Sequence, residues 1–278
     1  MVDIYRPQTL AEALEIRAEH AALPFAGGTD LMVRHRRNAG VLPALSLPVL
    51  FLDQCRELSA IEVAADVVEI GAGVTLTQVA AHPGLPDILR QAVREIGGPA
   101  VRNVATLGGN ICNASPAADS LPPLYALDAE VRLCSARSER VLPIQQFVTG
   151  PGRTAIRSDE LLRSIRVRPW WPDVSLWRKV GTRKANALSK VSIAACADRE
   201  GSGIGRVGIA LGAIAPTVVR LHAVEALLRG HRAGELSERV RQICRQEFSP
   251  IDDQRSTARY RATVGENLVL GFIALFDG

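Results

Sequence analysis

The chain has 278 residues, of which 47% are hydrophobic, 22% charged and 4% aromatic, and its formal net charge at pH 7 is +4. This length allows two domains, with cores packed mainly from Ala, Val, Leu and Ile because aromatic residues are scarce. The basic runs lack interleaved aromatic residues, which argues against nucleic acid as a partner.

Cysteine usage and hydropathy exclude further classes of protein. The cysteines are odd in number and form no CxxC pair: Cys55, Cys112, Cys134, Cys196 and Cys244. This pattern argues against a disulfide framework, a zinc site or an iron–sulfur cluster held by the chain alone. No apolar stretch approaches the roughly 20 residues that cross a bilayer, and the N-terminus has no signal-peptide pattern. We therefore expect a cytoplasmic protein without a transmembrane segment.

The first predicted elements surround a glycine pair. A capping-box pattern at Thr9 and Glu12 begins a helix that we expect to end near His20. Strands are expected at 22–25 and 49–52, and a helix at 30–37. A strand that leads into a glycine turn and a helix start favours phosphate, because backbone amides and the helix dipole face the anion.

Alternating strands and helices continue to residue 167. Strands are expected at 67–73, 129–134 and 160–167. Helices are expected at 75–82, at 85–96 and within 117–127. Residues 97–103 form a turn-rich approach to a second glycine pair.

That second pair lies in the most informative segment of the chain, 106–119, with the sequence Thr-Leu-Gly-Gly-Asn-Ile-Cys-Asn-Ala-Ser-Pro-Ala-Ala-Asp. A loop that wraps a diphosphate needs such a composition, since glycine allows close backbone approach and positive φ. Successive amides can then face one anion, and Thr, Asn and Ser add donors. A similar run, Phe-Ala-Gly-Gly-Thr-Asp-Leu, occupies 25–31. Two such loops predict one elongated, phosphate-containing ligand held from both sides.

The second half of the chain begins after a connector at 168–173, where two prolines surround two tryptophans. Strands are expected at 175–181, 189–198 and 206–215, and helices at 219–229, 234–246 and 256–275. Strands followed by helices indicate an α+β domain. The cluster of Trp170, Trp171 and Trp177 predicts either domain packing or a contact with a partner subunit.

The two glycine motifs together resemble the FAD-binding loops of the flavoprotein (medium) subunit of molybdenum hydroxylases, the family of bacterial xanthine dehydrogenases and carbon monoxide dehydrogenase. Segments 179–191, 215–220 and 250–261 also resemble family sequences. The resemblance implies an α+β protein with a two-subdomain FAD-binding domain of vanillyl-alcohol-oxidase type at 1–168, divided into about 1–53 and 54–168. A smaller α+β C-terminal domain is implied at 174–278.

The resemblance also implies a function, that of the FAD-carrying electron-transfer subunit of a molybdenum hydroxylase. Such a subunit accepts electrons from the [2Fe–2S] clusters of a small partner and passes them from reduced FAD to NAD⁺ or another acceptor. A large partner subunit holds the molybdenum cofactor and hydroxylates the substrate, for which segment 188–191 favours a purine or another N-heterocycle. The expected assembly is a dimer of heterotrimers.

The family match assigns one set of residues to FAD, and none to catalysis on the organic substrate or to a metal. This set is Phe25, Ala26, Gly27, Gly28, Thr29, Asp30, Leu31, Ile96, Thr106, Gly108, Gly109, Asn110, Asn113, Ser115, Asp119, Leu162 and Lys179. Amides of both motifs would hold the pyrophosphate, with the Thr29 and Thr106 hydroxyls adding bonds. Cys112 has no assigned redox role.

Several of these residues have an alternative interpretation. Asn113 and Ser115 are donors to phosphate or the ribityl chain, or else make local turn bonds. Asp119 accepts from a hydroxyl of the ligand, or else caps the next helix. Lys179 stabilises the reduced flavin, or else is a solvated strand lysine. Ile96 and Leu162 pack against the cofactor or belong to the core.

Two other functions are open on the sequence alone. One is a stand-alone FAD oxidoreductase with the same type of domain. The other is a nucleotide-binding module without turnover. A yellow purified chain would favour either enzyme, and co-purification with molybdenum and iron–sulfur chains would select the subunit.

Overall fold

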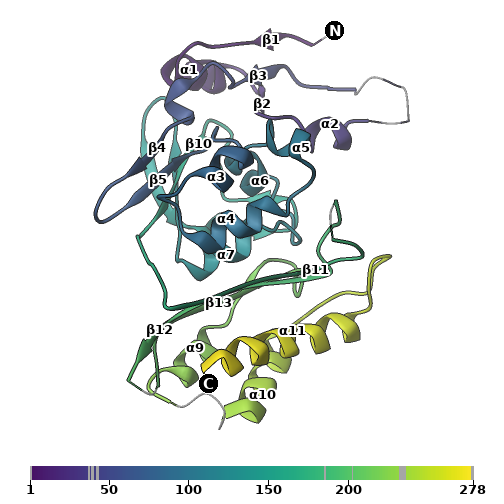
Figure 1. Cartoon of the computed structure of the whole chain (residues 1–278). Helices are drawn as coiled ribbons and strands as arrows, with labels where there is room; N and C mark the ends of the chain where they lie inside the picture. Colours follow the sequence, from purple (N-terminus) through teal and green to yellow (C-terminus); the bar gives the residue numbers. More distant parts are fainter. Residues whose placement is uncertain are drawn as a thin grey trace.

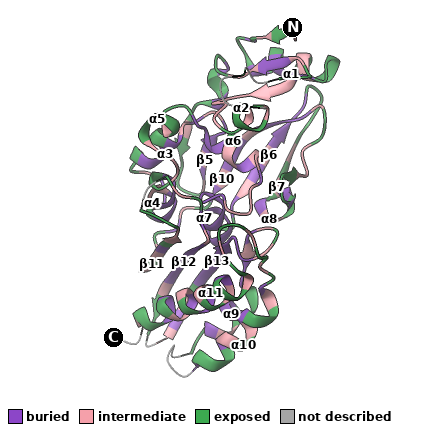
Figure 2. Ribbon diagram, turned by 90° about the vertical axis from the view of Figure 1, so that its right-hand side faces the viewer, coloured by how far each residue is buried: buried purple, intermediate pink, exposed green. Residues whose placement is uncertain are grey.

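The computed structural model describes residues 2–36, 38, 41, 44–184, 186–201, 203–231 and 236–276. Three layers follow one another along the molecule in Figure 1: a small N-terminal sheet, a larger sheet with helices against it, and a C-terminal sheet covered by helices. Buried residues follow the strands of the two large sheets, and exposed residues follow the outer helices (Figure 2). Within the described ranges, every helix is too short or too polar to span a bilayer.

The N-terminal subdomain contains a three-stranded parallel sheet in the order β1-β3-β2. Its elements are β1 (Ile4–Tyr5), α1 (Leu10–Glu19), β2 (Leu23–Phe25), α2 (Leu31–Arg34), β3 (Val49–Phe51) and the 3-10 helix η1 (Arg56–Leu58). The strands run in the same direction, with Ile4 opposite Val49 and Phe25 opposite Phe51. Their carboxyl ends therefore meet at one edge of the sheet.

Helix α1 confirms the expectation at 9–20, because the Thr9 side chain accepts a hydrogen bond from the amide of Glu12. Helix α2 is shorter than the predicted helix at 30–37, and Asp30 makes no capping hydrogen bond there. Residue 37 itself lies outside the described residues.

The second subdomain contains a five-stranded antiparallel sheet in the order β4-β5-β10-β6-β7. Its strands are β4 (Ile61–Val63), β5 (Val68–Gly71), β6 (Glu130–Cys134), β7 (Glu139–Pro143) and β10 (Leu161–Val167), and a separate hairpin is formed by β8 (Val148–Gly150) and β9 (Arg153–Thr154). Its helices are α3 (Leu76–Ala81), α4 (Asp87–Arg94), α5 (Pro99–Arg102), α6 (Leu107–Cys112), α7 (Leu121–Ala126) and α8 (Ile144–Phe147).

One face of this sheet is apolar and the other is charged. Ile70, Val131 and Ile165 are fully buried in the main core. Their neighbours Arg132 and Glu69 form an ion pair of 3.2 Å on the opposite face. This alternation is typical of an antiparallel sheet that is covered on one side.

The C-terminal domain is an antiparallel sheet in the order β11-β12-β13-β14 with helices on one face. Its elements are β11 (Val174–Val180), β12 (Val191–Glu200), β13 (Gly203–Gly212), β14 (Val219–Arg220), α9 (His222–Leu228), α10 (Ser237–Glu247), α11 (Ala258–Ile273) and the 3-10 helix η3 (Ala274–Phe276). The predicted helix at 219–229 is wrong at its start, because Val219 pairs with Leu211 and extends the sheet. The predicted helix at 234–246 begins in residues outside the described ones.

The other face of the C-terminal sheet packs on α7 of the second subdomain. Small residues make this approach possible: a Cβ at Gly208 would lie 2.2 Å from the carbonyl oxygen of Ala126. Trp170 is buried and donates a hydrogen bond from Nε1 to Asp198 at 2.8 Å, whereas the Trp171 side chain is 58% exposed. The connector therefore contributes to domain packing through Trp170.

Candidate functional site

A cleft of about 1060 Å³ lies between the N-terminal sheet and the second subdomain, and residues from both line it. Its size is at the upper end of the range for small-molecule and cofactor sites. The predicted site residues that line it are Phe25, Ala26, Gly27, Asp30, Leu31, Thr106, Gly108, Gly109, Asn113 and Leu162. The other predicted site residues lie outside this lining: Gly28, Thr29, Ile96, Asn110, Ser115, Asp119 and Lys179.

The first glycine motif turns sharply between β2 and α2. Gly28 has a φ of +67°, a left-handed conformation that favours glycine. A Cβ at Gly27 would lie 2.0 Å from the carbonyl oxygen of Val104 and 2.9 Å from the Cα of Ala105, the residue that directly precedes the second motif. The two motifs are therefore in backbone contact, and neither glycine can carry a side chain without local rearrangement.

The amides of this first motif differ from those of an ordinary turn in their hydrogen bonding. Among the described residues, no group accepts a hydrogen bond from the amides of residues 26–30. Unpaired amides need water or a ligand, because a buried donor without a partner is costly. A row of free amides beside a left-handed glycine is an anion-binding arrangement.

The second motif differs from the expected loop, because it is the first turn of helix α6 with Thr106 as its N-cap. Four of its amides have acceptors inside the protein: Leu107 donates to Val74 O at 2.9 Å, Gly108 to Ala72 O at 2.9 Å, Gly109 to Thr106 Oγ1 at 3.0 Å, and Asn110 to Thr106 O at 3.0 Å. A Cβ at Gly108 would lie 2.6 Å from that same Ala72 oxygen. This hydrogen bonding does not match the predicted amide contacts with pyrophosphate, and Gly108 serves close packing.

Arg34 was not identified from the sequence, although its position four residues after Asp30 on a helix was an available signal. Its guanidinium lines the cleft and joins the two motifs. Nε lies 3.1 Å from the carboxylate of Asp30, and Nη2 donates to the carbonyl oxygen of Asn113 at 3.3 Å. A cation between the two motifs favours an anionic ligand.

The polar residues that follow the second motif mainly bond within the chain. Asn110 Oδ1 accepts a hydrogen bond from Ser120 Oγ at 2.6 Å, and Ser115 Oγ accepts one from the amide of Ala117 at 3.3 Å. The bond to Ser115 is the local turn bond foreseen as its alternative. Cys112 lines the cleft, and burial raises the pKa of its thiol to about 12, so the thiol stays protonated at neutral pH.

A second group of predicted residues meets at the boundary between the domains. Lys179 Nζ donates to Asp119 Oδ2 at 2.6 Å and to the carbonyl oxygen of Glu95 at 3.0 Å, which places β11 beside Ile96. Ser189 donates to the other oxygen of Asp119. Burial raises the pKa of Asp119, and the charge of Lys179 opposes that rise.

This arrangement excludes two of the alternatives considered above. Lys179 is not a solvated lysine, because its side chain is only 8% exposed. Asp119 does not cap the next helix, because Ser120 occupies the N-cap position of α7.

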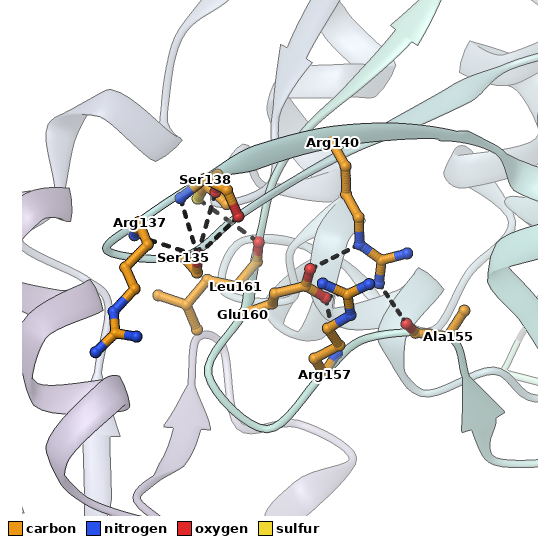
Figure 3. A network of polar contacts seen from close by, with 9 residues as sticks. Ser135, Arg137, Ser138, Arg140, Ala155, Arg157, Glu160 and Leu161 are labelled. Carbon is orange, nitrogen blue, oxygen red and sulfur yellow. Dashed lines mark hydrogen bonds and ion pairs between the residues drawn. The ribbon is translucent and has the colours of Figure 1, made fainter.

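One wall of the cleft is held by the polar network in Figure 3. Arg140 on β7 donates to Glu160 through Nε at 2.6 Å and through Nη2 at 2.8 Å, and also to the carbonyl oxygen of Ala155 at 2.7 Å. The amide of Arg157 donates to Glu160 at 2.8 Å. These bonds fix residues 155–160, and the flanking Leu161 and Leu162 line the cleft.

Among the described residues, no group of His, Cys, Asp and Glu could hold a metal ion.

Two family models match the chain in succession. The one described as "FAD binding domain in molybdopterin dehydrogenase" matches residues 1–171, and the one described as "CO dehydrogenase flavoprotein C-terminal domain" matches residues 178–275. The first match fits the observed cleft, its free amides and its left-handed glycine.

Characterised relatives align along most of the chain. The xanthine dehydrogenase FAD-binding subunit of Escherichia coli O157:H7 is 31% identical over 267 residues, covering 92% of this chain and 89% of the relative. The caffeine dehydrogenase subunit beta of Pseudomonas sp. (strain CBB1) is 30% identical over 282 residues, covering 98% of this chain and 93% of the relative.

Solved structures share the fold. A chain of the reconstituted CO dehydrogenase from Oligotropha carboxidovorans superposes with a TM-score of 0.90 at 22% identity, covering 99% of this chain and 96% of that chain. A chain of quinoline 2-oxidoreductase from Pseudomonas putida 86 gives a TM-score of 0.88 at 21% identity, with coverage of 99% and 96%.

These matches and the cleft define the chain as an oxidoreductase subunit with a FAD-binding domain and a C-terminal domain. In complexes of this kind, partner subunits carry molybdopterin and iron–sulfur clusters. The chain belongs to the family of FAD-binding (medium) subunits of the molybdenum hydroxylases, which includes the xanthine dehydrogenase subunits.

Proposed function

We propose that this chain is the electron-transfer subunit of a molybdenum hydroxylase complex. In this proposal it receives electrons from the [2Fe–2S] clusters of a small subunit and delivers them to NAD⁺ or another acceptor. A large subunit would hold the molybdenum cofactor. The names of the relatives support separate subunits, since one is an FAD-binding subunit and another a subunit beta. When bound, FAD supplies the redox chemistry, and the protein sets its position.

The free amides of residues 26–30 carry this proposal. They would hold the pyrophosphate, together with the hydroxyls of Thr29 and Thr106. Arg34 adds a positive charge between the two motifs. Gly27 and Gly28 support the same assignment, because they form the turn between Ala26 and Asp30, which both line the cleft.

The flavin ring would lie toward the C-terminal domain. Support comes from the meeting of Asp119 and Lys179 at the domain boundary, where Lys179 also donates to the carbonyl oxygen of Glu95, the residue before Ile96. The charge of Lys179 would stabilise negative charge on the ring. Leu162, on the cleft wall, would contact another part of the same ligand.

The proposal also covers the type of FAD-binding domain, the assembly of the complex and its substrate. Two subdomains on either side of one cleft support an FAD-binding domain of vanillyl-alcohol-oxidase type at 1–168, followed by the C-terminal domain at 174–278. We assign the protein to the cytoplasm, as part of a dimer of heterotrimers. The names of the xanthine, caffeine and nicotinate dehydrogenase relatives support a purine or another N-heterocycle as the substrate of the complex.

The test compares two glycines that share a backbone conformation. Gly28 and Gly201 have φ values of +67° and +58°, but only Gly28 lies in the motif. The left-handed φ makes alanine cost roughly 1–2 kcal/mol of stability at either position. At Gly28 the added Cβ would also lie 2.3 Å from the ring of Phe25, which lines the cleft, whereas at Gly201 it meets nothing within 4 Å, so thermal unfolding of both variants is recorded. Gly28→Ala should also abolish FAD binding, measured as flavin absorbance of the purified, reconstituted chain, whereas Gly201→Ala should retain it.

The electron-transfer part has its own measurement. Anaerobic NADH should bleach the flavin absorbance of the loaded complex if NAD⁺ is its acceptor. A chain that binds no FAD, or a Gly28→Ala variant that binds it as tightly as the unmodified chain, would contradict the assignment of the site.

A further inference from the structure

The carboxyl edge of the N-terminal parallel sheet extends the cleft beyond the glycine motif. Residue 26 directly follows β2, Asp53 follows β3, and Arg6 follows β1, and all three line the cleft. Ligands of parallel sheets bind outside the carboxyl ends of the strands. The strand order β1-β3-β2 places Arg6 two strands from the motif, a separation of roughly 10 Å at the usual strand spacing.

Arg6 and Asp53 form a pair that fixes the carboxylate at this edge. Arg6 Nε donates to Asp53 Oδ1 at 3.2 Å, and Nη2 donates to Oδ2. Gln54 Nε2 also donates to Oδ2, at 2.9 Å. The pair holds the pKa of Asp53 below its usual range, chiefly through the hydrogen bond from Arg6. Asp53 is therefore an ionised acceptor, and Oδ1 has capacity for a further hydrogen bond.

This end of the cleft also has apolar walls and a second guanidinium. Leu58 and Leu161 line the cleft and belong to the apolar cluster beneath α1. Arg17 on α1 lines the same cleft, and its buried Nε has no hydrogen-bond partner among the described residues. Apolar side chains beside a planar guanidinium suit a flat heteroaromatic ring.

The orientation of the ligand follows from where the proposed flavin site and the N-terminal sheet lie in the molecule. The cluster of Ile96, Asp119 and Lys179 lies at the boundary with the C-terminal domain, whereas β1 and β3 lie at the opposite extreme (Figure 1). A dinucleotide anchored at residues 26–30 with its flavin toward Lys179 therefore directs its nucleoside half toward Arg6 and Asp53.

We propose that Asp53, held by Arg6, is the residue that recognises the adenosine half of the cofactor, with its carboxylate accepting hydrogen bonds from the ribose hydroxyls. An acidic residue has this role in other dinucleotide folds, because vicinal hydroxyls are paired donors for a carboxylate. The inference rests on the proposed function, and it makes Asp53 the determinant that selects FAD over FMN.

The experiment measures affinities of the apo chain for FAD, FMN and ADP by equilibrium titration. Asp53→Asn keeps the size of the side chain and removes its charge. Asp87→Asn is the matched control, because Asp87 forms an ion pair of 3.5 Å with Arg90 on α4 and does not line the cleft. Thermal unfolding of each variant verifies that the fold is intact.

Asp53→Asn should weaken the affinity for FAD and for ADP by tenfold or more and leave the affinity for FMN unchanged. Asp87→Asn should leave all three affinities unchanged. The inference is overturned if Asp53→Asn keeps FAD affinity within twofold, or if FAD and FMN weaken equally. ADP titration keeps the test independent of the flavin half. Failure of the proposed function is a different result, since the unmodified chain would then bind no FAD.

Discussion

Asp119 and Lys179 join the two domains through an ion pair of 2.6 Å in which both side chains are almost fully buried. Sixty positions of sequence separate them, and the family resemblance predicts that both contact the cofactor. The carbonyl of Glu95 accepts a further hydrogen bond from Lys179, and the hydroxyl of Ser189 donates one to Asp119, so both charged groups have partners within the protein. The domain boundary is therefore polar at this point, as it also is where Arg220 of the C-terminal domain pairs with Asp128 of the second subdomain at 3.0 Å.

Breaking this pair should destabilise the protein strongly. Lys179→Met leaves the carboxylate of Asp119 buried without a counter-charge, which costs about 3–5 kcal/mol. Urea unfolding followed by circular dichroism measures the loss. Arg178→Met on the same strand is the control, because an exposed side chain at that position contributes within about 0.5 kcal/mol. A Lys179→Met variant as stable as this control would contradict the structural role of the pair.

Acid stability should depend on Glu160. Its hydrogen bond from Arg140 lowers its pKa below the ordinary value of 4.5. Between the two pKa values the unfolded chain binds more protons, so stability rises with pH there. The contribution is complete above pH 4.5 and is lost as pH falls through the folded pKa.

The variant that tests this is Glu160→Gln. It should be less stable by about 1–3 kcal/mol at neutral pH, because a charged hydrogen bond is lost. Its difference from the unmodified chain should shrink below the pKa of the folded state. Glu15→Gln, on the exposed face of α1, serves as the control. A difference that stays constant from neutral to acidic pH would argue against the assigned titration.

Cys112 offers a chemical readout of cofactor binding. It lines the cleft and is only partly buried, whereas the other four cysteines are buried. Its raised pKa of about 12 should make alkylation slow, since the thiolate is the reactive form. Mass spectrometry of the maleimide-treated apo chain should find Cys112 modified first, and saturating FAD should suppress that modification. Equal rates with and without FAD would place the ligand elsewhere.

Local patterns predicted most of the elements. The capping side chain of Thr9 starts α1 where the sequence indicated, and the apolar runs of the C-terminal half form β12 and β13. These signals depend on near neighbours in the chain. The predicted start of the helix at 219 is wrong, because Val219 pairs with Leu211 of another strand. Local patterns along the chain do not predict such a pairing.

In the candidate site, too, the sequence predicted some features and missed others. The first glycine motif was identified from composition, and its left-handed Gly28 matches the need for glycine at that position. The second motif was interpreted as a loop, although Thr106 caps a helix there and takes up one of its amides. Gly108 is needed for packing, since Ala72 occupies the space that a side chain there would fill.

The sequence by itself determines the order of strands, helices and glycine turns, because each of these elements depends on the spacing of residues along the backbone. That order and the motifs also determine the family. Only the tertiary structure decided that the amides of residues 26–30 find no acceptor in the described part of the chain, while those of Gly108 and Gly109 donate to Ala72 and Thr106. It also decided that Arg6 meets Asp53 and that Lys179 meets Asp119. Such pairings join strands and domains distant in sequence, so they depend on how the layers pack.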